Sequence, residues 1–128
     1  MKGILDTSVF IAAEQGRSLV AEDLPDEAAV SVVTLGELEL GVHMAESERT
    51  RAQRLATLRA LQATYVALPI DEAVAGAFAQ LVATTRRAGG RLKIQDAWIA
   101  ATAMTHSAAV YSQDADFDEL PGVDVVRV

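Results

Sequence analysis

The chain has 128 residues, of which 51% are hydrophobic, and its mean hydropathy is +0.21. This composition excludes collagen-like and disordered chains, and the length suits one compact domain, which we expect to span residues 1–128. Eighteen acidic residues against eleven basic ones give a net charge of −7, so the composition alone does not indicate a nucleic-acid-binding protein.

Cysteine is absent, which excludes a disulfide framework and thiolate chemistry and is compatible with a reducing compartment. Asp6 interrupts the apolar segment at the N-terminus where a signal peptide needs an unbroken one. The longest uncharged run, residues 97–113, contains several hydroxyl side chains and a histidine and is not typical of a membrane span. We therefore expect a cytoplasmic protein.

In chain order, apolar runs alternate with helical patterns. A strand over residues 3–5 leads into a helix that Thr7 or Ser8 can cap and that closes near Gly16. Further strands are predicted over 29–33, 65–68, 109–111 and 123–128. Further helices are predicted over about 34–44, 47–63, 71–87 and 95–106. Because parallel neighbours need crossover connections, this order predicts an α/β fold: a single three-layer domain with a parallel central sheet and helices on both faces.

Four acidic residues lie where the chain leaves a predicted strand or enters a helix: Asp6, Glu37, Asp96 and Asp114. Reactive groups in parallel α/β sheets gather beyond the carboxyl ends of the strands. Each residue also has a purely structural interpretation. Glu37 completes a capping box with Thr34, Asp96 suits the positive end of a helix, and Asp114 is an ordinary turn residue.

Four carboxylates at one edge would repel one another unless a cation joined them, and oxygen ligands without histidine or cysteine favour Mg²⁺ or Mn²⁺ over Zn²⁺. Asp116 is a candidate further ligand or supporting group. The hydroxyls of Thr7 and Ser112 can orient the neighbouring carboxylates or simply cap the backbone. The sequence contains no Walker loop, dinucleotide fingerprint or nucleophile elbow.

Four segments, in order and spacing, resemble the motifs of PIN-domain nucleases and, more narrowly, of VapC-type toxins of toxin–antitoxin pairs. They are Ile4-Leu5-Asp6-Thr7-Ser8-Val9, Ser31-Val32-Val33-Thr34-Leu35-Gly36-Glu37-Leu38, Gln95-Asp96-Ala97-Trp98-Ile99-Ala100-Ala101 and Tyr111-Ser112-Gln113-Asp114-Ala115-Asp116-Phe117. The resemblance covers essentially the whole chain. It departs from the common pattern at Ser112, where threonine is commoner, and at Asp114, where asparagine is frequent.

The resemblance implies a Mg²⁺-dependent endoribonuclease, with Mn²⁺ able to substitute, whose catalytic acids map onto Asp6, Glu37, Asp96 and Asp114. It implies Asp6 and Asp96 as the usual metal ligands, and Asp114 and Asp116 are the remaining candidates. The division of labour between these last two is open, and Glu37 or Asp114 could instead accept a proton from the attacking water. The implied partners are an RNA substrate, a cognate antitoxin and a second copy of the chain in a homodimer, with a higher assembly on antitoxin binding.

Eight of the eleven basic residues fall in two clusters. One cluster comprises Arg49, Arg51, Arg54 and Arg59, and the other comprises Arg86, Arg87, Arg91 and Lys93. Both can be solvated helix surfaces. We expect one or both clusters to flank the acidic residues and bind RNA phosphates, with Arg91 and Lys93 the first candidates because they lie nearest to Asp96 in the sequence.

Apolar residues on more than one side of the helix over 34–44 indicate a second face that needs burial, which the resemblance assigns to homodimer and antitoxin contacts. Other hypotheses are a PIN ribonuclease of RNA processing, a catalytically idle PIN scaffold and a receiver-like phosphoacceptor domain. A receiver-like domain would need an acidic pair after the first strand, and a dehalogenase-type phosphatase would need a second aspartate there. This sequence has only Asp6 at that place.

Overall fold

The computed structural model describes residues 2–19, 24–118 and 120–128. Five strands form one sheet: β1 (Lys2–Leu5), β2 (Glu27–Ser31), β3 (Val66–Leu68), β4 (Ala109–Ser112) and β5 (Val125–Arg127). The helices are α1 (Thr7–Glu14), α2 (Val32–His43), α3 (Glu48–Thr64), α4 (Glu72–Arg87), α5 (Ile94–Thr105) and the short 3₁₀ helix η2 (Ala115–Phe117).

The strand order is β3-β2-β1-β4-β5, and all four strand pairs are parallel. The chain leaves β1 towards β2 on one side and later returns to place β4 on the other side. The carboxyl ends of β1 and β4 therefore meet at the point where the strand order reverses, which is where parallel α/β folds bind ligands.

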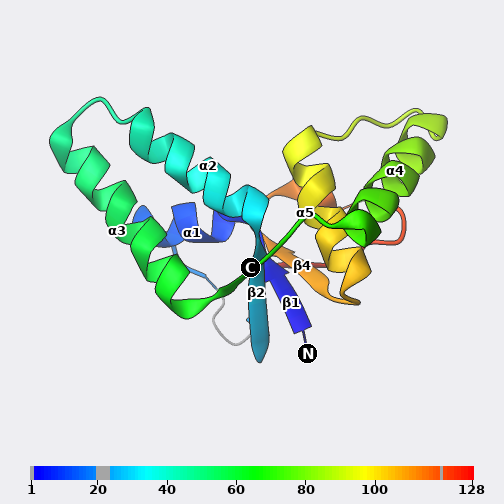
Figure 1. Cartoon of the computed structure of the whole chain (residues 1–128), viewed down its shortest axis with the longest axis horizontal. Coiled ribbons are helices and arrows are strands. Elements are labelled where there is room, and N and C mark those ends of the chain that lie inside the picture. The colour runs from blue at the N-terminus through cyan, green and yellow to red at the C-terminus, as the bar shows by residue number, and fades with distance from the viewer. Residues whose placement is uncertain (1, 20–23, 119) are drawn as a thin grey trace.

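Helices cover both faces of the sheet, as predicted (Figure 1). One core contains Ile4, Val110 and Phe117 and packs against α4 and α5. The other core contains Val30 and Tyr111 together with side chains of α1, α2 and α3. Figure 1 shows α2 and α3 as one helical arm and α4 and α5 as a second, with the carboxyl ends of the strands between them.

The predicted end of the second strand is wrong by two residues. The strand stops at Ser31, because the Ser31 hydroxyl accepts a hydrogen bond from the Val33 N–H at 3.1 Å and so begins α2 at Val32. The predicted capping box is therefore absent: Thr34 lies inside α2, where it is fully buried. A capping serine overrides the β propensity of the valines that follow it.

The cap of the first helix also differs from the prediction. The side chain of Asp6 accepts from the Ser8 N–H, so Asp6 is the N-cap, and neither Thr7 nor Ser8 holds that position. The loop after β4 contains η2, which the sequence did not predict. In the part of the chain that the structure describes, no helix is both long and apolar enough to cross a membrane.

The second apolar face of α2 is present. Leu35 and Leu38 pack against the core on one side of the sheet. Leu40 and Met44, by contrast, are 61% and 68% exposed. The first arm thus presents two large apolar side chains to solvent near the end of α2.

Candidate active site

Asp6 lies at the carboxyl end of the central strand and is 4% exposed. Its Oδ2 accepts hydrogen bonds from the Ser112 hydroxyl at 2.9 Å and from the Ser8 N–H at 3.3 Å. Both bonds reach the same oxygen, so the carboxylate is held in one orientation by groups from β4 and α1. The sequence predicted that Ser112 orients its neighbour Asp114, but its hydroxyl donates to Asp6 and meets only the backbone N–H of Asp114.

Glu37 enters from α2 and meets the first turn of α1. The Thr7 hydroxyl donates to Glu37 Oε1 at 2.7 Å and lies 3.1 Å from the hydroxyl of Thr34. Burial raises the pKa of Glu37, the bond from Thr7 partly offsets this, and the charge of Asp6 raises it further. Glu37 therefore lies close enough to Asp6 for the charge of Asp6 to raise its pKa.

Three further carboxylates, from α5 and from the segment after β4, lie close together. Asp96 in the first turn of α5 and Asp114 and Asp116 at η2 each offer an oxygen, and these atoms lie within 4.8 Å of one another. Asp114 is held by the N–H groups around it. Its own N–H donates to Ser112 Oγ at 2.8 Å, and its Oδ1 accepts from the Asp116 N–H at 2.9 Å.

Asp96 has the most unusual hydrogen-bonding environment of these carboxylates. Among the described residues, its buried Oδ2 has no hydrogen-bond partner, although buried polar atoms are nearly always satisfied. Burial, followed by the charges of Asp6, Asp114 and Asp116, raises the pKa of Asp96 to about 7. A buried oxygen without a donor, surrounded by three other carboxylates, fits a divalent cation with a preference for oxygen ligands.

Lys93, the residue before α5, forms an ion pair with Asp116 at 3.0 Å between Nζ and Oδ2. The hydrogen bond to Asp116 and the charges of Asp116, Asp114 and Asp96 raise the pKa of Lys93. The cation and the carboxylate are both largely exposed, so we assign little stability to the pair. Its position is the informative part, because it brings one predicted RNA-binding residue against the acidic cluster.

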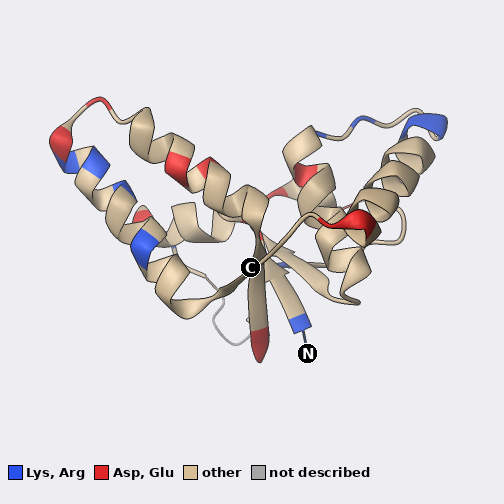
Figure 2. Ribbon diagram, viewed as in Figure 1, with Lys and Arg blue, Asp and Glu red and all other residues tan. Residues whose placement is uncertain are grey.

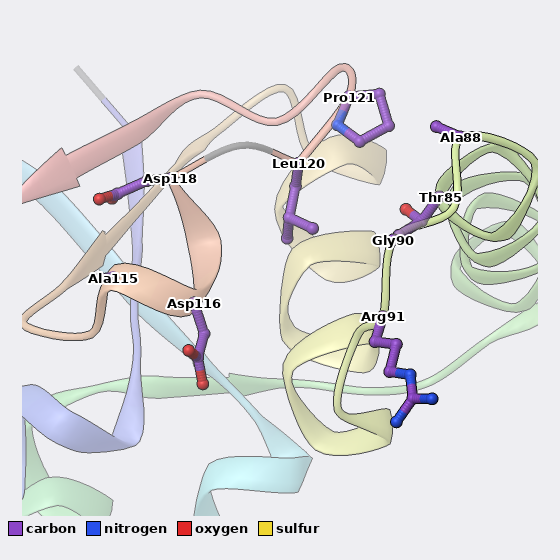
Figure 3. A pocket seen from close by; sticks show the side chains of 9 residues that line it. All are labelled: Thr85, Ala88, Gly90, Arg91, Ala115, Asp116, Asp118, Leu120 and Pro121. Carbon is purple, nitrogen blue, oxygen red and sulfur yellow. The ribbon is translucent and has the colours of Figure 1, made fainter.

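A cavity of about 590 Å³ continues from the acidic cluster towards the end of α4 (Figure 3). Arg91 lines one wall and Asp116 the other, and both side chains extend towards the same end of it. Arg86 lines an adjoining cavity with Arg91 and Leu92. Arg87 is exposed at the end of α4. Three of the four predicted RNA-binding residues thus border the acidic cluster or the space beside it.

Sequence reasoning missed two hydroxyl groups at this site. Ser8 Oγ accepts from the Gln113 N–H at 3.0 Å and lies 3.1 Å from Ser112 Oγ, so it joins α1 to the segment after β4. Thr34 contacts Thr7 beneath Glu37. Ser8 and Thr34 each had a local interpretation as a helix cap, and no sequence signal distinguished a cap from a contact across the sheet.

Comparison with known proteins places this geometry in a family. A model of the PIN domain matches residues 3–123. The chain is 46% identical to Ribonuclease VapC5 of Mycobacterium tuberculosis, covering 98% of this chain and 95% of the relative. It is 44% identical to Ribonuclease VapC4 of the same organism, covering 99% and 97%.

Among solved structures, the chain resembles the crystal structure of VapBC-5, a member of the VapBC family of toxin–antitoxin systems from Mycobacterium tuberculosis. The TM-score is 0.91 and the sequence identity 42%, over 99% of this chain and 98% of the other. Sequence and fold therefore agree over nearly the full length.

Proposed function

The chain belongs to the PIN-domain family, and we propose that it is a metal-dependent endoribonuclease and the toxin of a VapBC-type toxin–antitoxin pair. In this role it hydrolyses RNA phosphodiester bonds and inhibits growth or translation until its antitoxin neutralises it. The observation that supports catalysis most directly is the buried, unpartnered oxygen of Asp96 beside Asp114 and Asp116. We place the activity in the cytoplasm, where the RNA substrate is found.

Asp96, Asp114 and Asp116 are the residues that would hold the cation, with Asp6 as the fourth carboxylate. Asp6 belongs with them because its charge acts on Asp96 and because Ser112 contacts both Asp6 and the backbone of Asp114. The all-oxygen donor set favours Mg²⁺, with Mn²⁺ as a substitute. When bound, such an ion offsets the negative charge that develops on the phosphoryl oxygens during hydrolysis.

Glu37 is the proposed proton acceptor. It lies apart from the three clustered carboxylates, and the bond from Thr7 to Oε1 orients its carboxylate. Its raised pKa brings it closer to the range in which a carboxylate removes a proton from water at neutral pH. Asp114 is less suited to this role because its Oδ1 is already engaged by the Asp116 N–H within the cluster.

The RNA backbone is proposed to lie along the cavity that Arg91 and Asp116 line. Arg91 offers a planar fork for phosphate oxygens, and Lys93 offers a point charge next to the carboxylates. Arg86 borders the adjoining cavity and extends the basic surface, and Arg87 lies next to it on α4. Phosphates held there would present the neighbouring bond to the acidic cluster.

The antitoxin is proposed to bind the apolar surface of the first arm. Leu40 on α2 and Met44, directly after its last residue, are exposed. A groove of about 490 Å³ between α1 and α3 is lined mostly by apolar side chains, including Phe10, Ala56 and Tyr65. An antitoxin segment with apolar side chains fits the groove between α1 and α3. A second copy of the chain in a homodimer fits the exposed apolar side chains outside the groove.

The decisive experiment measures cleavage of single-stranded RNA by the purified protein in EDTA and after addition of Mg²⁺ or Mn²⁺. We expect cleavage only with metal, and loss of cleavage in Asp6→Ala and Asp96→Ala. Metal-independent cleavage, or full activity in both variants, would contradict the proposed chemistry.

The toxin role is tested separately in cells. Expression of the wild-type chain should arrest growth, Asp96→Ala should not, and co-expression of the antitoxin encoded beside it should restore growth. A PIN ribonuclease of ordinary RNA processing would have no neighbouring antitoxin gene and would cause no reversible arrest.

A further inference from the structure

Arg127 joins the two ends of the acidic segment that follows β4. Its Nη1 donates to Asp118 Oδ2 at 3.0 Å, and its Nη2 donates to the backbone carbonyl of Gln113 at 2.9 Å. Asp114 and Asp116 lie between these two contacts. One guanidinium therefore spans the stretch of chain that carries two of the three clustered carboxylates.

The sheet determines where this guanidinium stands. Arg127 is paired in register with Ser112, the last residue of β4, and the Val128 N–H donates to the Ser112 carbonyl at 3.1 Å. Since Gln113 follows Ser112 directly, the pairing of β5 with β4 places the guanidinium beside the start of the acidic segment. Figure 3 shows the side chains of Asp116 and Asp118 leaving the segment in different directions, although both line the cavity.

Other contacts fix the middle of the segment, and the Gln113 N–H donates to Ser8 Oγ at its start, while Arg127 provides the side-chain contact that ties Gln113 to Asp118 at the far end. Phe117 is fully buried and anchors η2, and Asp114 caps η2 through its bond to the Asp116 N–H. Lys93 approaches Asp116 from the side of α5. The repulsion among Asp114, Asp116 and Asp118 acts to open this short stretch, and a cation that spans it opposes that opening.

We propose that Arg127 is a positioning residue for the metal centre: its guanidinium holds residues 113–118 in the conformation that presents Asp114 and Asp116 to Asp96. This inference rests on the proposed function, because it assumes that these carboxylates hold a cation. The planar fork of arginine suits the task because it reaches a carbonyl and a carboxylate at once. Lysine carries all its donors on one nitrogen, so it cannot reach the two acceptors from two separate nitrogens as arginine does.

Charge and positioning predict opposite signs for the loss of Arg127. A positive charge near a cation site repels the cation, so its removal by charge alone should tighten metal binding. If Arg127 positions the ligands, its removal should weaken metal binding instead. The direction of the change therefore separates the two roles, whatever its size.

The test is isothermal titration of the full chain with Mn²⁺ alone, in wild type, Arg127→Met and Arg127→Lys. We expect Arg127→Met to weaken Mn²⁺ binding roughly tenfold, at the lower end of what groups supporting metal ligands contribute. We expect Arg127→Lys to fall between Arg127→Met and the wild type. Thermal unfolding of the metal-free proteins checks folding, and because the Arg127–Asp118 pair is exposed we expect little change there.

Two variants serve as matched controls. Arg91→Met removes a positive charge on the other side of Asp116 without touching the segment, and it should leave Mn²⁺ affinity unchanged or tighter. Arg59→Met removes an exposed charge on α3 and should leave it unchanged. Unchanged or tighter binding in Arg127→Met overturns the inference and leaves the metal centre intact. If the wild type itself binds no Mn²⁺, the proposed metal centre fails and the inference fails with it.

Discussion

The two basic clusters have nearly the same composition but lie on opposite arms of the molecule. Figure 2 shows one along α3 and the other around the connection from α4 to α5, with acidic residues of α2 and α5 between them. On α3, Arg54 donates to the Gly41 carbonyl of α2 at 2.7 Å, and Arg51 pairs with Glu48 one helical turn away. Near α5, Lys93 reaches Asp116, and Arg91 lines the cavity beside it.

A cluster of basic residues therefore acquires its role from what its side chains can reach. In the α3 cluster, Arg54 joins α3 to α2, and Arg51 forms an ion pair within the helix. The α4–α5 cluster directs its charges to the edge where the carboxylates gather. The net charge conceals this contrast, because the value of −7 sums the acidic residues at the edge of the sheet with the basic residues beside them.

The largest expected effect is the loss of catalysis in Asp96→Asn. Removal of this charge from the centre of the acidic edge should lower the RNA cleavage rate on the order of 10³-fold, comparable to the loss of a key electrostatic group in other enzymes. The rate is measured with saturating Mg²⁺. Asp124→Asn, the same chemical change at an exposed site, should retain full activity, and equal losses in the two variants would contradict a special role for Asp96.

The next effect is on stability, in the absence of metal. The pKa of Asp96 is raised to about 7, so the folded state binds a proton that the unfolded state releases near pH 4. The free energy of unfolding should therefore fall as pH rises from about 4 to about 7. We expect a fall of about 2 kcal/mol by urea denaturation in EDTA, discounted from the full shift for partial exposure.

Asp96→Asn is the control for this pH dependence, because it removes the titrating group. Its free energy of unfolding should change less over the same pH range and exceed that of the wild type at pH 8. A pH profile identical to that of the wild type would show that Asp96 has an ordinary pKa in the folded protein.

Binding of RNA tests the contrast between the clusters directly. In an Asp96→Asn background, which prevents cleavage, Arg91→Ala should raise the Kd for single-stranded RNA about tenfold. It should also reduce the slope of log Kd against log salt by about 0.7, the value for one lost phosphate contact on a single strand. Arg59→Ala in the same background should change neither quantity. Equal effects of Arg91→Ala and Arg59→Ala would make the two clusters equivalent.

The smallest effects concern the α3 cluster itself. Arg54→Ala removes a half-buried hydrogen bond between α3 and α2 and should lower the free energy of unfolding by about 1 kcal/mol. Arg51→Ala breaks an exposed pair within one helix and should cost less than about 0.5 kcal/mol. Both are measured by urea denaturation at neutral pH. A larger cost for Arg51→Ala than for Arg54→Ala would reverse the assignment of structural roles.

Much of the fold could be predicted because local patterns determine it. Alternating apolar runs and helical periods predicted the five strands and five longer helices in their order along the chain. The parallel sheet followed from the crossover connections between strands. The errors occurred where two local signals competed, as at Ser31, whose hydroxyl caps α2 and so ends the strand before Val32 and Val33. Such a competition is decided by one hydrogen bond, which composition does not reveal.

The candidate site was predictable to the extent that it depends on strand ends. Asp6, Glu37 and Asp114 follow strands, and the carboxyl ends of parallel strands share one edge, so their proximity could be inferred from position alone. The contacts of Ser8 and Thr34 could not be inferred. They join α1 to residues 105 and 27 positions away, respectively, and so depend on which elements pack side by side.

Caps, turns and apolar periods act over a few residues, so the sequence predicted the strands, the helices and the acidic residues at the ends of the strands. Which carboxylates lie together, which arginines border them and that Arg127 spans the segment carrying Asp114 and Asp116 depend on how distant elements pack. The physical reason is the strand order, which places β4 between β1 and β5 and so brings Ser112 beside both Asp6 and Arg127.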